Sequence, residues 1–273
     1  MTTKPKPQPR KRKFPGPKAP LRVMQIMEQL GMAPHGLPLG RLAEKLGTPK
    51  TTLLSFLRVL EEGRYIRNVE GVYRIAELGI RLGTIISHAN PFPSSLHDAL
   101  VKVTEESGET TLLAVLTESQ DRIVYVDMVE SRSAIRFSAT IGTPRPLHST
   151  AAGRALLAAQ TDDWINQFLK TSALEKHTKE TITKVPALRS EIAKIRHTGV
   201  CETHEEYSIG VSGFAAVIYD ARSKPAAAVL IAAPTSRAKQ ERDRLINSAR
   251  NAATAMSHIL GAANRAALIR SKA

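Results

Sequence analysis

The chain has 273 residues, a length that favours two domains. Its formal charge is +14 and 42% of its residues are hydrophobic, a globular composition with a basic bias. Its single cysteine, Cys201, excludes an internal disulfide and a zinc site made of several thiolates, which suits a reducing cytosol. The longest apolar run, residues 226–233, is too short to span a membrane, and residues 1–20 lack the apolar stretch of a secretion signal, so we expect a cytoplasmic protein without a membrane partner.

The excess of positive charge is concentrated at the N-terminus. Residues 1–90 carry 16 basic and 6 acidic side chains, a net charge of +10, whereas residues 91–273 carry only +4. Residues 1–18 hold seven of the basic groups, several prolines and no acid, so they are predicted to form a disordered basic arm. Two interpretations remain open at this point, namely an arm that contacts the phosphates of a polyanion and a tail that only solubilises the protein.

The segment after the arm has the periodicity of a small helical unit. Apolar side chains recur at helical spacing over residues 23–30, and residues 39–46 place them at i, i+3, i+4 and i+7. Gly47 ends this second helix, Thr48 is a candidate N-cap, and Pro49 would occupy the first position of a third helix. Two helices joined by a short turn that contains glycine form a helix-turn-helix, whose second helix can lie in the major groove of DNA.

The third helix is predicted to run to about Glu62 and to be followed by a hairpin. Residues 64–67 and 72–75 have the pattern of short strands around a turn, which is typical of the wing of a winged helix. On the wing, Arg67 and Arg74 suit contact with phosphates or with the minor groove. The candidate DNA-contacting residues are Arg22, Lys50, Thr51, Thr52, Ser55, Arg58, Arg67 and Asn68. A helical protein-interaction module has the same periodicity, and Thr51 and Thr52 also fit ordinary first-turn residues that bond the backbone.

Beyond residue 76 the chain is predicted to be a mixture of helices and strands without regular βαβ alternation. The expected helices are 77–89, 94–107, 150–159, 163–169, 185–196 and 236–263, and the expected strands are 110–116, 123–129, 135–139, 214–219 and 226–231. The first of these helices would link two domains. The pattern of the others predicts an α+β domain with a sheet that carries helices on its faces.

The sequence lacks the common motifs of enzyme active sites. It contains no nucleophile elbow, no phosphate-binding Gly-Lys-Ser/Thr loop and no H-E-x-x-H zinc motif. Residues 201–206 together with His197 offer enough ligand types for one metal ion, but their spacing matches no standard zinc pattern, so a surface loop is the favoured interpretation. His148 and Ser149 are adjacent in sequence and lack an evident acid partner. We therefore expect neither catalysis nor a metal or other cofactor.

Several sequence blocks, in this order and spacing, resemble the IclR family of bacterial transcription regulators from about residue 20 to residue 261. The first block is the helix-turn-helix with its wing. The second is GTPRPLHSTAAGRALLA at residues 142–158, and the third extends from RHTG at 196–199 through Glu205-Glu206 and Gly210 to Tyr219-Asp220. The segment APTSR at residues 233–237 is similar to the end of the family's sheet.

The resemblance implies a particular domain organisation. After the arm at 1–18 it places a winged helix-turn-helix domain at 19–76, a linker helix that helps dimerisation at 77–90, and an effector-binding domain at 91–265. The last domain would have a GAF-like fold with a mixed or antiparallel sheet flanked by helices. Family members bind double-stranded DNA as homodimers or dimers of dimers, and a small metabolite, often an organic acid or an aromatic breakdown product, alters that binding.

The resemblance also implies the residues of the effector site. Carried over position by position, they are Phe137, Ala151, Ala152, Thr203, Gly213, Leu230 and Ala232. Backbone N–H groups near Ala151 and Ala152, at the start of a helix, would suit a carboxylate. The implied function is a ligand-responsive, sequence-specific regulator of catabolic genes, either a repressor or an activator. The alternative is a sensor or interaction module that does not itself recognise an operator.

This chain also departs from the family pattern. Some members carry an acid, a cysteine and serines where this chain has Thr203, Gly213, Leu230 and Ala232, which predicts an apolar pocket with few donors. Such a pocket favours an effector with a large apolar body, such as an aromatic acid, over a short keto acid. Leu230 and Ala232 fit ordinary core residues equally well. Many relatives carry an arginine at the position of Ser55, so that contact either passes to Arg58 or Lys50 or is lost.

Overall fold

The computed structural model describes residues 19–89 and 92–262. The chain divides into two compact units, 1–89 and 90–273, which are treated separately below. The predicted basic arm, residues 1–18, lies outside the described residues. None of the described helices combines the length and the hydrophobicity that crossing a bilayer would require.

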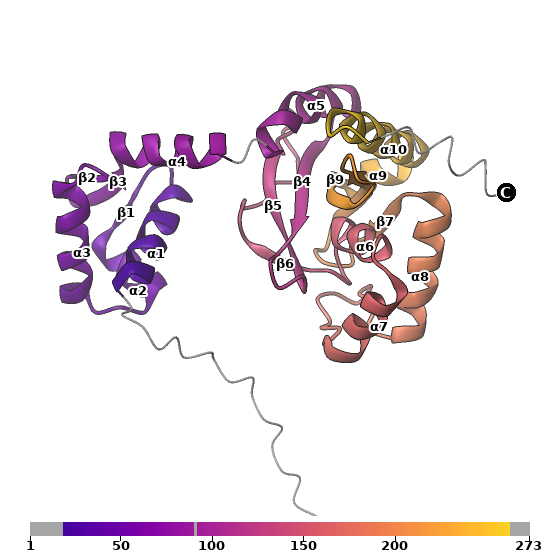
Figure 1. The fold of residues 1–273 in the computed structure, drawn as a ribbon, viewed down its shortest axis with the longest axis horizontal. Coiled ribbons are helices and arrows are strands. Elements are labelled where there is room, and N and C mark those ends of the chain that lie inside the picture. The colour runs from indigo at the N-terminus through magenta and orange to yellow at the C-terminus, as the bar shows by residue number, and fades with distance from the viewer. Residues whose placement is uncertain (1–18, 90–91, 263–273) are drawn as a thin grey trace, which may run out of the picture. The chain divides into compact units, whose positions relative to one another are not determined.

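In the first unit, three helices and a small antiparallel sheet precede the helix at residues 77–89, as Figure 1 shows. Its elements are α1 (Ala19–Gly31), β1 (Leu37–Pro38), α2 (Leu39–Leu46), α3 (Lys50–Glu62), β2 (Ile66–Val69) and β3 (Val72–Ile75), and the sheet order is β1-β3-β2. Helix side chains such as Ile26, Leu42 and Leu57 form its core with Ile66 and Tyr73 of the hairpin. The two-residue strand β1 was not predicted, because it is too short to show strand periodicity.

The start of α3 differs from the prediction by one residue. Pro49 is the N-cap rather than the first helical residue, and its carbonyl oxygen accepts the N–H of Leu53 at 3.0 Å. The buried Thr48 hydroxyl instead donates to the carbonyl of Leu46, at 3.1 Å, and therefore does not cap α3. The turn between α2 and α3 is closed by Gly47, whose φ of 55° is in the left-handed region that favours glycine.

Helix α4 (Glu77–Ala89) begins against the hairpin of the first unit. A Cβ atom on Gly79 would lie 2.4 Å from the carbonyl oxygen of Tyr65 and 2.8 Å from Cγ2 of Ile75. Glycine is therefore required for this close approach, which fixes the first turn of α4 on the wing. Farther along, Leu82, Ile85 and Ile86 follow i, i+3, i+4 spacing and are exposed.

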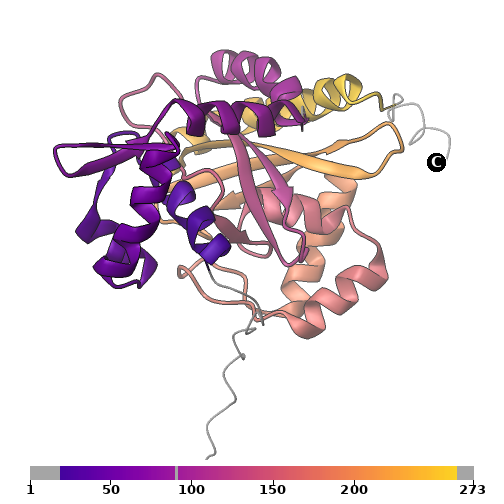
Figure 2. The ribbon, with the colours of Figure 1, turned by 60° about the vertical axis from the view of Figure 1, so that its left-hand side comes forward.

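The second unit is a six-stranded antiparallel sheet between two helical layers. Its strands are β4 (Thr110–Leu116), β5 (Arg122–Val129), β6 (Pro144–Pro146), β7 (Cys201–His204), β8 (Val211–Tyr219) and β9 (Pro225–Pro234), in the order β6-β5-β4-β9-β8-β7. Its helices are α5 (Phe92–Ser107), α6 (Ala151–Ala158), α7 (Asp162–Thr171), α8 (Val185–Thr198), α9 (Thr235–Gln240) and α10 (Arg242–Ile259). Helices α5 and α10 lie side by side on one face of the sheet, and α6, with α7 and α8, lies on the other (Figures 1 and 2). The predicted α+β class is confirmed.

Burial of both faces explains why β8 and β9 are continuously apolar in sequence. Along β9, Val229 and Ile231 face the core under α5 and α10, whereas Leu230 and Ala232 face the core around α6. A strand buried on both sides has no polar face, so it reads as an unbroken apolar run.

Three predicted elements in this unit were wrong. Residues 135–139 are not a strand but a loop, held by the Thr110 hydroxyl, which donates to the carbonyl of Phe137 at 2.7 Å. The segment 201–204, expected as a surface loop, is the strand β7, with Cys201 and Thr203 buried. The predicted terminal helix is interrupted at Glu241, which lies between α9 and α10. Short edge strands such as β6 and β7 carry too few residues for their alternation to be recognised.

Candidate functional site

The exposed face of α3 carries the predicted DNA-contacting side chains of this helix. Leu53, Leu57 and Leu60 are buried against α1 and α2, whereas Lys50, Thr51, Thr52, Ser55 and Arg58 are exposed. Thr51, Ser55 and Arg58 follow one another at i, i+4 and i+7, so they share one face of the helix. Such a helix, anchored by its apolar side, presents polar groups where a duplex could be bound.

Three of the predicted DNA residues also have structural partners inside the unit. Arg22 Nη1 donates to the carbonyl of Leu46 at 2.9 Å, which places a cation at the C-terminus of α2. The Ser55 hydroxyl donates to the carbonyl of Thr52, and the Asn68 side chain accepts the N–H of Gly71 at 2.9 Å in the hairpin turn. Asn68 therefore shapes the wing, and its side chain is a turn former as well as a candidate contact.

The wing concentrates positive charge on one of its faces. Arg67 and Arg74 are opposite each other in the β2–β3 register, so their side chains leave the hairpin on the same side. Two like charges at this spacing repel each other unless an anion lies nearby. Arg67 is exposed, and neither arginine forms an ion pair with any residue that the structure describes.

In the second unit, six of the seven residues carried over from the family surround one small cavity of about 40 Å³. Phe137, Ala151, Thr203, Gly213, Leu230 and Ala232 line it. Ala152, in contrast, is buried in the core around α6 and is not among the lining residues.

The sheet register explains how this cavity forms. Thr203, Gly213 and Ala232 are paired across β7, β8 and β9, so they form one row on the face that α6 covers. A Cβ on Gly213 would lie 3.0 Å from Cβ of Ala151 and 3.1 Å from Cδ1 of Leu230. Glycine at this position therefore allows the N-terminus of α6 to approach the sheet and keeps the cavity open.

The cavity also has polar walls that the sequence did not reveal. Its further lining residues are Tyr125, Arg145, Ser149, Thr150, Glu206, Tyr207, Ser208 and Val211. Arg145 Cζ lies 5.3 Å from the ring centre of Tyr125 and 5.2 Å from that of Tyr207. Burial raises the pKa of Tyr125 to about 12, against the opposing effect of Arg145, so this phenol is neutral near pH 7. The cavity thus has donors beside the apolar residues carried over from the family, and these donors come from residues outside that set.

A buried ion pair holds one wall of the cavity in place. The guanidinium of Arg154, which is fully buried in α6, forms two hydrogen bonds with the carboxylate of Glu206 and a third, from Nε, with the carbonyl of His148 at 2.8 Å. The hydroxyls of Thr178 and Thr181 donate to backbone carbonyls of residues 205 and 206. Loop 205–210 is therefore fixed at Glu206, next to Tyr207.

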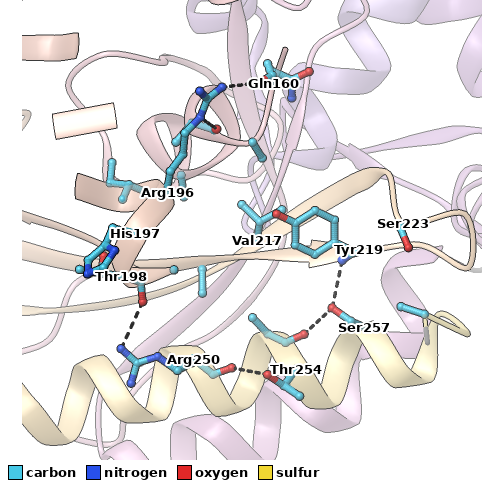
Figure 3. A pocket seen from close by; sticks show the side chains of 18 of the residues that line it. Gln160, Arg196, His197, Thr198, Val217, Tyr219, Ser223, Arg250, Thr254 and Ser257 are labelled. Carbon is cyan, nitrogen blue, oxygen red and sulfur yellow. Dashed lines mark hydrogen bonds between the residues drawn. The ribbon is translucent and has the colours of Figure 1, made fainter. Parts of the chain in front are cut away.

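A larger cavity of about 740 Å³ lies elsewhere in this unit, between the ends of α6 and α8 and the C-terminal half of α10. Its arginines already have protein partners (Figure 3). Arg196 donates to the carbonyls of Ala158 and Gln160 and pairs with Asp162, and Arg250 donates to the carbonyl of Thr198. Arg250 also donates to Asn247. We favour the smaller cavity as the ligand site, because its polar groups are not all paired, as described below.

The possible metal-binding and catalytic groups do not converge. Within residues 19–89 and 92–262, no group of three or more His, Cys, Asp and Glu could hold a metal ion. Cys201 faces the core, and burial raises the pKa of its thiol to about 12. His204, on the other face of β7, is hydrogen-bonded to Ser212 and Glu202. His148 contacts the carbonyl of Glu175, and burial lowers its pKa, so it is neutral near pH 7.

Comparison with known proteins finds the same two-part organisation. Residues 88–258 match the family described as bacterial transcriptional regulator IclR C-terminal, and residues 19–70 match the IclR helix-turn-helix domain. The transcriptional repressor IclR of Escherichia coli is 28% identical over 223 residues, which cover 81% of each chain. The HTH-type transcriptional regulator TtgV of Pseudomonas putida is 31% identical over 81% of this chain and 83% of its own. The crystal structure of Thermotoga maritima IclR superposes with a TM-score of 0.69 at 25% identity, over 88% of this chain and 99% of that one.

The fold and these likenesses define a transcriptional regulator that carries a DNA-binding helix-turn-helix domain and a separate C-terminal domain. The chain belongs to the IclR family of bacterial transcriptional regulators. Since its relatives regulate transcription and are not enzymes, the chain is a regulator rather than an enzyme.

Proposed function

We propose that the protein is a ligand-responsive regulator of catabolic genes, acting as a repressor or an activator in the bacterial cytoplasm, where the chromosome lies. Helix α3 enters the major groove of operator DNA, and the wing contacts the neighbouring backbone. The observation that carries this proposal is the exposed polar and basic face of α3, with the arginine pair of the wing beside it in the same unit. The chain self-associates as a homodimer or a dimer of dimers, with the exposed stripe of α4 as a contact.

The effector is a small organic or aromatic acid that binds in the cavity between α6 and the sheet. The row of Thr203, Gly213 and Ala232, with Leu230 and Phe137, supplies apolar walls. The N-terminus of α6 and the polar walls supply donors for a carboxylate. The ligand changes operator affinity only to the extent that it binds one conformation of the protein better than another.

The double substitution Lys50→Ala with Arg58→Ala tests the DNA half of the proposal. Each side chain is expected to contribute one phosphate or base contact of about 1–3 kcal/mol, so the affinity should fall by several kcal/mol in total. Fluorescence anisotropy with the duplex that the wild-type protein enriches from a random pool measures this loss. In the same variant, stabilisation by carboxylate ligands in a thermal-shift assay should persist.

The matched control is Arg222→Ala with Lys239→Ala, which removes the same charge from exposed positions of the second unit. It should bind the duplex nearly as well as the wild type. Unchanged DNA binding by the α3 variant would show that this helix is not the recognition helix.

A further inference from the structure

Two polar atoms in the wall of the small cavity have no hydrogen-bond partner. Ser149 Oγ is one of them, in a residue that is fully buried, and Arg145 Nε is the other. A buried donor without a partner costs about 1–3 kcal/mol, so such atoms usually mark a place where a ligand or water is bound. Both residues line the same cavity, so two donors without partners belong to side chains of its wall.

The charge of the cavity is also unbalanced. Arg145 and Glu206 are the charged residues among those that line it. The Glu206 carboxylate is already bonded to the guanidinium of Arg154, and Arg145 forms no ion pair with any residue in the described ranges. His148, which contacts the aromatic cluster through His177, is neutral near pH 7 and adds no charge. One positive charge thus remains without a counter-charge.

Aromatic rings frame this charge. Arg145 is bracketed by the rings of Tyr125 and Tyr207, and the ring of Tyr207 also contacts His177, with 4.9 Å between ring centres. Phe137 and Leu230 complete the apolar wall. A cation that projects between flat apolar surfaces matches a ligand with a planar ring and a single carboxylate, because the carboxylate pairs with the guanidinium while the ring contacts the walls.

We propose that Arg145 and Ser149 form the carboxylate subsite of the effector cavity and that they determine its specificity for planar monocarboxylates. This inference rests on the proposed function, since it assigns the ligand of the same cavity. It places the main anion contact on a side chain of the edge strand β6 rather than on the backbone of α6 alone. The cavity of about 40 Å³ is smaller than a benzoate ion, so its walls must open on binding, while the Arg154–Glu206 pair holds one of them in place.

Titration of the full-length protein with benzoate and with its neutral isostere benzamide tests the proposal. The wild type should bind benzoate roughly 10- to 100-fold more tightly than benzamide, the range expected for a charge-assisted contact. In Arg145→Met this preference should disappear while the affinity for benzamide changes by less than about threefold. Ser149→Ala should weaken benzoate binding roughly three- to tenfold, and Arg145→Lys should keep part of the preference.

The controls separate this inference from the proposed function. Arg122→Met removes a cation from the neighbouring strand β5, at an exposed position outside the cavity lining, and should leave the preference intact. An unchanged preference in Arg145→Met would overturn the subsite but not the effector site. A wild-type protein that binds neither compound, yet binds its operator and is stabilised by another class of ligand, would overturn the inference alone. Failure of every ligand to change DNA affinity would overturn the proposed function.

Discussion

Two glycines set how closely α6 approaches its surroundings. Gly213 brings the helix to the sheet, as described above, and Gly153 brings it to the turn before the helix. A Cβ on Gly153 would lie 2.5 Å from Oγ1 of Thr150 and 2.7 Å from both Cα and the carbonyl oxygen of Leu147. The last two atoms belong to the backbone, so a side chain at this position cannot be accommodated by a change of rotamer.

Gly153→Ala should lower the free energy of unfolding of the second unit by about 1–3 kcal/mol, because the added methyl forces the first turn of α6 away from residues 147–150. Urea unfolding followed by circular dichroism measures the effect. Gly40→Ala in α2 is the matched control, since its nearest neighbour would be Cε of Lys50 at 3.9 Å. The control should be neutral or stabilising by up to about 1 kcal/mol. Equal stability of the two variants would contradict the packing argument.

For individual residues too, the sequence revealed only part of the proposed ligand site. Leu230 and Ala232 could be proposed from the family resemblance, and the structure places both on the cavity wall. Arg145 and Ser149 could not, because their significance depends on missing hydrogen-bond partners, which no sequence pattern encodes. The sequence offered a signal only for the edge strand that carries Arg145, namely the prolines on either side of it, since proline is tolerated on an edge strand.

Among the elements, long and strongly periodic segments were predicted well and short ones were not. Helix α2 and strands β4, β8 and β9 follow from apolar periodicity or from unbroken apolar runs. Strands β1, β6 and β7 contain two to four residues each and are defined by their pairing, β1 with β3, β6 with β5 and β7 with the following strand β8. The tertiary contact, rather than local propensity, makes these segments strands.

Helix α4 carries its apolar stripe in solvent. Ile85 and Ile86 are 54% and 61% exposed, and Leu82 lies one turn before them. Apolar side chains at i, i+3 and i+4 usually face a partner helix or a core, so this stripe supports a role in self-association.

Ile85→Glu with Ile86→Glu should therefore shift the protein toward the monomer and weaken operator binding, because charges on the stripe would be desolvated in a helix pair. Analytical ultracentrifugation at micromolar concentration measures the mass. Ile135→Glu with Ile209→Glu, at positions that are 73% and 80% exposed in the second unit, is the matched control. If both variants keep the mass of the wild type, α4 is not the association surface.

For the whole molecule, the distribution of charge separates general attraction to DNA from recognition. Of the net charge of +14, residues 1–18 contribute +7 and residues 21–90 only +3. The winged domain is thus mildly basic, and we expect its specificity to depend on where a few arginines and Lys50 lie rather than on their number.

Deletion of residues 2–18 should make the slope of log K for DNA binding against log salt concentration less negative, by about 0.9 for each phosphate that these residues neutralise. Titrations of one operator duplex at several salt concentrations give the slope. A variant with the seven basic residues of this segment replaced by serine keeps its length and should behave like the deletion. An unchanged slope would show that the segment only solubilises the protein.

The position of Arg145 on β6 has a consequence for the diversity of such regulators. Strand β6 has three residues and pairs with β5 alone, so a substitution there disturbs no other strand. If Arg145 selects the ligand as proposed, a lineage that exchanges this cation for a neutral or acidic side chain at one codon would respond to a different class of metabolite. The helix-turn-helix, encoded elsewhere in the gene, would keep its operators. Which signal is sensed and which genes are controlled can therefore evolve independently.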